Sequence, residues 1–158
     1  MNKQILIVIA TLFIGSALYS KERNYTGKTA EQIARACQQT DSWLEARIDV
    51  TSCDPNDIRS EEIIRTYARQ LCALLNLTTH ELVGNEPTIS YYGGNKQTNG
   101  FLLMFATAQA HCTARFVNMS NSIYLTISSK KAFDPYATAE FTKKFFKASN
   151  CATSVALR

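Results

Sequence analysis

The chain has 158 residues, enough for one domain with a sizeable core, because a domain of about 150 residues buries roughly 70% of its unfolded surface. Hydrophobic residues make up 46% and charged residues 19%, which are ordinary globular values, and the sequence has no low-complexity tract and no internal repeat, so neither a disordered nor a repeat protein is expected. The net charge of +4 comes from 17 basic and 13 acidic residues without a dense basic stripe interleaved with aromatic residues. Nucleic-acid binding is therefore not expected.

The first twenty residues differ in kind from the rest of the chain. After one early lysine, an uncharged apolar run extends from Ile5 to Tyr19 and ends before the charged stretch at Lys21. This run is short for a helix that must cross about 30 Å of hydrocarbon, and it fits the apolar region of a secretory signal. We therefore expect residues 1–20 to be a signal peptide or an uncleaved N-terminal membrane anchor. The protein is accordingly expected to be exported (periplasmic or extracellular) or membrane-anchored.

The five cysteines are an odd number, and neither a Cys-x-x-Cys pair nor clustered histidines accompany them. A metal site is therefore not expected, and at least one thiol stays free or pairs between chains. Two of the cysteines, Cys72 and Cys112, fall among apolar neighbours, which favours small core residues over bridges. The others are Cys37, Cys53 and Cys151.

The next segment, residues 21–42, is polar and contains one short helical pattern around residues 29–37, so it is a linker or a packing arm. From Trp43 to Val50 apolar residues alternate with charged ones, which is the period of a half-buried strand. Residues 51–57 then form a predicted turn.

A helix is predicted after Ser60, which suits the N-cap position and is followed by apolar residues at helical spacing up to Leu75. Residues 80–92 read as a strand interrupted at Pro87, and residues 93–100 as a loop rich in glycine and asparagine. Three further strands are expected at residues 101–108, 111–117 and 122–128.

Asp134 followed by Pro135 is a clear helix start, a capping carboxylate before a proline at the first helical position. The helix is expected to run to about Ala148, and residues 151–157 form a last strand. One side of this helix carries Ala137, Phe141 and Phe145. This order of elements predicts an α+β fold, a two-layer sandwich with a mostly antiparallel sheet and two helices on one face.

Two stretches, DVTSCDP at residues 49–55 and FDPYATAEFTKKFF at residues 133–146, together with the order of the helices, resemble the bacterial type of S-adenosylmethionine decarboxylase. The resemblance covers residues 43–158. It implies an enzyme that cuts its own chain between Glu and Ser of a Glu-Ser-His run. The serine then becomes a pyruvoyl group, which binds the substrate amine as a Schiff base and acts as electron sink for loss of CO2.

The residues of that run are altered here. Matched through His111, the family's glutamate is replaced by Gln109 and its serine by Ala110. A methyl side chain can neither attack the preceding carbonyl nor become a pyruvoyl group. We therefore expect no pyruvoyl cofactor and no catalytic residue, with His111 retained as a scaffold residue.

Other positions of the family site differ as well. The match implies Arg115 in place of the family's second histidine, which falls on Ala114 in a shifted alignment, and Ser128 or Ser129 in place of a catalytic cysteine. The Trp-Pro-Glu that contacts the adenosyl group in the family is replaced by Val117, Asn118 and Met119.

Some ligand-binding capacity could remain in this site. Tyr91 and Tyr92 stand where the family has an aromatic residue that stacks on adenine, or else one packs in the core and the other faces solvent. His111 and Arg115 share one face of a strand and would suit an anionic ligand.

Three functions remain open. We expect an exported pseudoenzyme that serves as an assembly or binding subunit. The alternative is a pyruvoyl-free lyase that releases methylthioadenosine from S-adenosylmethionine, tested at Glu81, Tyr91 and Tyr92. A true decarboxylase requires an active partner chain in a heteromeric assembly. In each case a homo-oligomer, most simply a dimer, is expected because a two-layer sandwich leaves one sheet face uncovered and the family joins subunits through its sheets.

Overall fold

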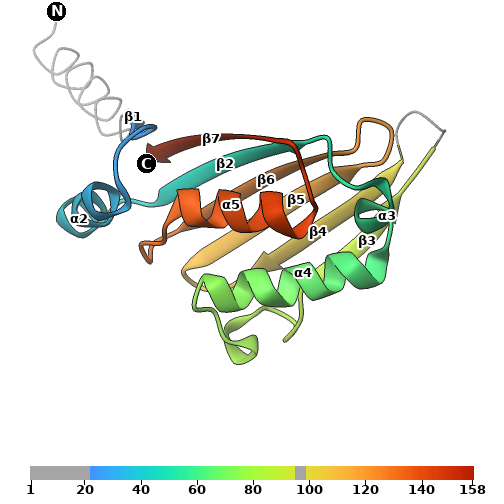
Figure 1. Ribbon diagram of the computed structural model, residues 1–158. Coiled ribbons are helices and arrows are strands. Elements are labelled where there is room, and N and C mark those ends of the chain that lie inside the picture. The colour runs from blue at the N-terminus through green and yellow to red at the C-terminus, as the bar shows by residue number, and fades with distance from the viewer. Residues whose placement is uncertain (1–21, 95–98) are drawn as a thin grey trace, which may run out of the picture.

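The computed structural model describes residues 22–94 and 99–158. Seven strands form one sheet in the order β1-β7-β2-β6-β5-β4-β3, and every neighbouring pair is antiparallel (Figure 1). The predicted signal or anchor at residues 1–20 lies outside the described residues. The strands are β1 (Arg23–Asn24), β2 (Leu44–Thr51), β3 (Thr88–Tyr92), β4 (Gly100–Ala106), β5 (Ala110–Val117), β6 (Ser122–Ser129) and β7 (Asn150–Leu157).

Two long helices, α4 (Glu61–Leu74) and α5 (Pro135–Phe145), lie side by side across one face of this sheet (Figure 1). The predicted two-layer α+β sandwich is therefore confirmed. Two further helices, α2 (Ala30–Thr40) and α3 (Pro55–Ile58), and a 3₁₀ turn η1 (Thr79–Glu81), complete the described part of the chain.

The helix starts follow from capping side chains. Ser60 accepts a hydrogen bond from the Ile63 amide at the start of α4, as predicted. Asp134 accepts from the Tyr136 and Ala137 amides at the start of α5, also as predicted. The same Asp-Pro signal at Asp54 starts α3, although only a turn is predicted there from the sequence.

Residues between α4 and β3 do not form the long strand predicted for residues 80–92, and that prediction is wrong for all but Thr88–Tyr92. Gly84 and Asn85 have φ angles of 80° and 63°. Such angles reverse the chain and cannot continue a strand. Pro87 follows, and it lacks the amide hydrogen that a strand ladder needs.

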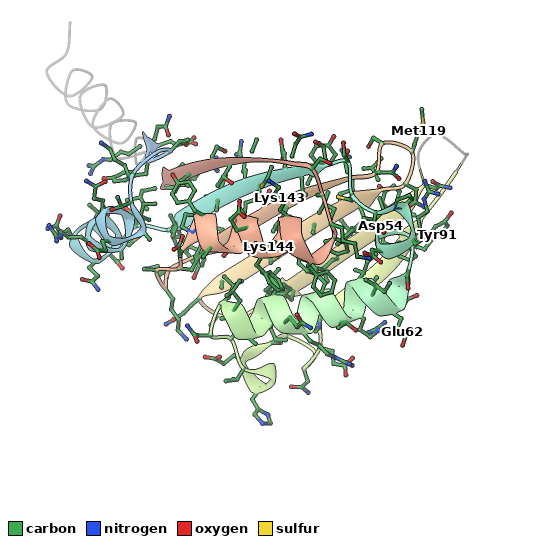
Figure 2. All side chains as sticks on the ribbon, in the orientation of Figure 1. Asp54, Glu62, Tyr91, Met119, Lys143 and Lys144 are labelled. Atoms are coloured by element: carbon green, nitrogen blue, oxygen red, sulfur yellow. The ribbon has the colours of Figure 1, made fainter. Side chains whose placement is uncertain are left out.

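The core lies between the helices and the sheet, where side chains crowd in Figure 2. Alternate residues of β2 from Leu44 to Val50 are buried on the helix side of the sheet, as the sequence period predicts, and Ile48 and Val50 belong to this core. The face of α5 differs from the prediction, because Ala137 is exposed. Its buried residues are Pro135, Thr138, Ala139 and Thr142, with Phe141 and Phe145 half-buried.

Residues 22–42 form a packing arm, one of the two roles left open for them. Strand β1 pairs with β7 at the sheet edge, and α2 begins with a capping box between Thr29 and Gln32. Ile33 and Cys37 of α2 belong to a small second core. Its other buried members are Leu44, Val155 and Leu157.

The sheet face opposite α4 and α5 has no helix over it among the described residues, and we call it the open face. Its side chains are the alternate ones along each strand, such as His111 and Arg115 on β5. Within residues 22–94 and 99–158, no helix is long and apolar enough to span a membrane.

Candidate functional site

Strand register places most of the predicted site residues on the open face. His111 lies opposite Ser128 of β6, and Ser128 in turn lies opposite Glu45 of β2. Four residues further along β5, Arg115 lies opposite Tyr124. The shared face of His111 and Arg115 follows from the two-residue period of a strand, as predicted.

The first group on this face surrounds His111. The imidazole is exposed, and its centroid lies 5.9 Å from that of the Trp43 ring at an angle of 43°. Trp43 is held by two backbone hydrogen bonds with Arg158, of 2.8 and 3.0 Å. Ser128 and Glu45 beside them are nearly buried, and Glu45 pairs with two arginines, Arg47 at 2.8 Å and Arg158 at 3.3 Å.

The second group surrounds Arg115. Its guanidinium carbon lies 5.4 Å from the centroid of the Tyr124 ring, a cation-π contact. Tyr124 lies opposite Asp49 of β2, so the row reads Asp49, Tyr124, Arg115 across three neighbouring strands. Asp49 and Arg115 are both exposed. The Arg115 guanidinium of this group suits an anionic partner, and together with Asp49 it suits a partner that carries both charges.

The two tyrosines of β3 lie on opposite faces of the sheet. Tyr91 is 61% exposed on the helix side, with its ring 5.4 Å from that of Phe101. Tyr92 lies on the open face and donates a 2.9 Å hydrogen bond to the Phe116 carbonyl. Partial burial raises the pKa of Tyr92, against a smaller opposite effect of Arg115. The pair therefore cannot enclose one ligand between two rings.

The predicted site residues fall at two ends of the sheet. Tyr92 pairs with Gly100 at the start of β4, whereas His111 pairs with Ala106 at its end. Six residues of a strand span roughly 20 Å. Arg115 therefore lies toward the Tyr92 end of the open face, and His111 lies at the other end.

Glu81 lies apart from the open face, in the 3₁₀ turn η1. Its carboxylate accepts hydrogen bonds from the amide and hydroxyl of Thr78 and pairs with Lys131 at 3.3 Å. These hydrogen bonds lower the pKa of Glu81, chiefly the one from the Thr78 amide. Because these hydrogen bonds and the ion pair already occupy its carboxylate oxygens, Glu81 serves to stabilise the turn.

The segment around Ala110 is a tight connection between β4 and β5. The Thr107 hydroxyl accepts from the Gln109 and Ala110 amides at 3.1 and 2.9 Å, and the Thr107 amide donates to the Ala110 carbonyl at 2.7 Å. The Ala110 methyl is buried on the helix side of the sheet, in a small cavity lined largely by apolar side chains such as Phe105 and Ile127. Thr107, three residues before Ala110, stabilises the turn through these hydrogen bonds.

Trp43, Glu45, Asp49 and Tyr124 share the open face and were not predicted as site residues. The shared face of Trp43, Glu45 and Asp49 could be read from the predicted strand, because its odd positions lie on one face. Tyr124 joins them only through the pairing of β2 with β6. No group of His, Cys, Asp and Glu residues that could bind a metal occurs in the described ranges. All five cysteines lie in those ranges and are free thiols.

Comparisons with known proteins identify the family of this chain. The crystal structure of adenosylmethionine decarboxylase from Aquifex aeolicus matches this fold with a TM-score of 0.54 and 16% identity, covering 72% of this chain and 88% of that chain. The family model of S-adenosylmethionine decarboxylase matches residues 45–158. The chain therefore belongs to the S-adenosylmethionine decarboxylase family. No curated protein matches the sequence.

Proposed function

We propose that this family member is an exported pseudoenzyme that serves as an assembly or binding subunit. The observation that carries the proposal is Ala110 at the position of the family's pyruvoyl-forming serine. An alanine offers no hydroxyl for self-cleavage, so the chain cannot form the pyruvoyl group that serves as electron sink in the family. Export rests on the apolar character of residues 1–20.

We expect the purified chain to remain intact between Gln109 and Ala110 and to lack a reactive carbonyl. Mass spectrometry after treatment with hydrazine or borohydride measures both properties in one sample. The expected result is a single chain, with or without residues 1–20, and no adduct. Two fragments of about two thirds and one third of the chain would contradict the proposal.

We expect S-adenosylmethionine to bind this protein weakly or not at all. Val117 and Met119 replace the family's aromatic and acidic contacts to the adenosyl group, and Met119 is 64% exposed in the turn after β5 (Figure 2). Losing a stacking contact costs about 0.5 to 1.5 kcal/mol and losing a charged hydrogen bond about 1.5 to 3. A micromolar ligand would then bind roughly 30- to 1,600-fold more weakly.

Titration calorimetry with S-adenosylmethionine and methylthioadenosine measures this affinity. Tyr92→Ala is the informative variant, because Tyr92 is the tyrosine of β3 that shares the open face with Arg115. Low-micromolar binding that disappears in this variant, together with release of methylthioadenosine, would favour the pyruvoyl-free lyase over the pseudoenzyme. The matched control is Tyr91→Ala on the opposite face, which should change neither quantity.

A further inference from the structure

A groove lies beside the packing arm, between residues 30–34, 74–76 and 132–138, and we call it the arm groove. Its volume is about 450 Å³, and its walls come from α2, the end of α4 and the beginning of α5. The end of α4 and the beginning of α5 both lie on the side of the sheet nearest α2 (Figure 1). The family model matches residues 45–158, so α2 adds a wall from outside the matched domain.

Contacts at both ends of α2 fix the arm against the domain. Before α2, the Gly27 amide donates a 2.7 Å hydrogen bond to the Tyr136 hydroxyl of α5. After α2, Asp41 pairs with Lys130 at 3.3 Å. Phe133, in the wall of the arm groove, packs against both the main core and the small core of α2. The arm groove is therefore preformed, and a partner would bind without the cost of ordering the arm.

The walls of the arm groove are mainly apolar, and several of their side chains are small. Ala30 and Ala34 lie one turn apart on α2, and Ala137 of α5 is exposed. Leu74 at the end of α4 is 41% exposed. Small side chains let the backbone of another helix approach closely, and an exposed leucine provides apolar contact. A groove of this kind suits the apolar face of an amphipathic helix.

The charges of the arm groove are acidic, although the chain as a whole has a net charge of +4. Glu31 and Asp134 are its charged lining residues, and both are exposed. Neither forms an ion pair within residues 22–94 and 99–158. Asp134 caps α5 through Oδ1 alone, so Oδ2 can accept from another donor. Lys130 and Lys131, just before the groove residues, are already in ion pairs with acidic residues elsewhere.

We infer that the arm groove binds an amphipathic helical segment of a partner protein, whose apolar face is flanked by lysine or arginine residues. This inference rests on the proposed role as a binding subunit and specifies the surface and the chemistry of the partner. The apolar face contacts Leu74 and the alanines of α2 and α5, and the flanking cations lie at Glu31 and Asp134. An acidic segment would instead place like charges opposite each other, which is unfavourable at an interface.

Two synthetic peptides test the charge preference of the arm groove. Both have about 15 residues, near the minimum for an isolated helix, and one face of leucine and alanine. One peptide carries lysines beside that face and the other carries glutamates. In fluorescence anisotropy with the purified protein, we expect the lysine peptide to bind at least about tenfold more tightly. The net charge of +4 alone would favour the glutamate peptide. Equal affinities, tighter binding of the glutamate peptide, or no binding of either would overturn the inference.

Reversing the charge at Glu31 tests whether the peptide lies in the arm groove. Glu31→Lys should weaken binding of the lysine peptide about 3- to 10-fold and strengthen binding of the glutamate peptide by a similar factor. Glu62→Lys is the matched control, because it makes the same charge change in the first turn of α4, at the opposite end of that helix from Leu74 (Figure 2). It should change each affinity by no more than about twofold at physiological salt. Equal effects of the two variants would exclude the arm groove as the binding site.

Obstructing the groove tests the apolar contact. Ala137→Trp should weaken binding of the lysine peptide at least about tenfold, because the indole would occupy the space of the bound segment. Lys144→Trp, on the same helix outside the groove lining, is the control and should stay within about twofold (Figure 2). Both positions are exposed, so both variants should keep the helical circular dichroism of the unchanged protein. An affinity that does not fall in Ala137→Trp would contradict the inference.

A photoreactive amino acid in place of Ala137 identifies the natural occupant in the native host. The expected product is a cross-link to a segment of another protein, with apolar residues flanked by lysine or arginine. A cross-link to a second copy, to residues 1–21 of the same chain, to lipid or to an acidic segment would overturn the inference. The proposed function fails separately, by a reactive carbonyl or an internal chain break. A processed chain that still prefers the lysine peptide would overturn the pseudoenzyme and leave the arm groove standing.

Discussion

Replacing Tyr67 by alanine is expected to lower the free energy of unfolding by about 3 to 5 kcal/mol, the usual cost of deleting a buried aromatic side chain. Tyr67 of α4 is fully buried and joins the two helices to the sheet. Its ring centroid lies 4.8 to 6.3 Å from those of four phenylalanines. These are Phe116, Phe141, Phe145 and Phe146.

The tyrosine hydroxyl contributes separately to this core. It lies 3.0 Å from the Thr142 hydroxyl, which itself donates to the Thr138 carbonyl at 2.8 Å, so Tyr67 is the donor. Burial raises the pKa of Tyr67 far above its usual value, and the group stays neutral. Tyr67→Phe is therefore the matched control, with an expected cost of about 0.5 to 1.5 kcal/mol.

Urea unfolding followed by far-UV circular dichroism measures both variants. If Tyr67→Ala were as stable as Tyr67→Phe, the cluster of Tyr67 and the four phenylalanines would not be the centre of the core.

The sequence predicted the sheet and the two long helices because their signals are local. Alternation along residues 44–50 and the caps at Ser60 and Asp134 each determine an element without reference to the rest of the chain. The strand prediction for residues 80–92 was wrong because it too depended on a local signal. Its apolar residues Leu82 and Val83 suggested a strand, whereas Leu82 packs into the core from an irregular segment.

The site was less predictable because it is assembled across strands. The sequence placed His111 and Arg115 on one face, but their neighbours Glu45, Asp49 and Tyr124 follow from pairing register, which a single strand does not specify. Tyr91 and Tyr92 are adjacent in the part of the predicted strand that is present, so their opposite orientation follows from the two-residue period, as in the alternative that placed the two rings in different environments.

Gly100 lies at the start of β4, where it pairs with Tyr92 of β3. A Cβ atom added there would overlap the Phe116 carbonyl oxygen of the neighbouring strand and would lie 2.9 Å from the Tyr92 hydroxyl. The hydroxyl could move away, but it would lose its 2.9 Å hydrogen bond to that same carbonyl. The carbonyl belongs to the backbone of β5 and cannot yield without moving the strand.

We therefore expect Gly100→Ala to destabilise the fold by about 3 kcal/mol or more, at or above the upper end of ordinary overpacking, because backbone rather than a flexible side chain obstructs the new methyl group. Gly94→Ala is the matched control, since a Cβ atom at Gly94 meets nothing within 4 Å and should leave stability nearly unchanged. Urea midpoints of the two variants measure the difference. Combining Gly100→Ala with Tyr92→Phe separates the two contacts: removing the tyrosine hydroxyl should recover only a small part of the loss, because the overlap with the Phe116 carbonyl remains. Full recovery in the double variant would instead assign the role of Gly100 to accommodating the Tyr92 side chain.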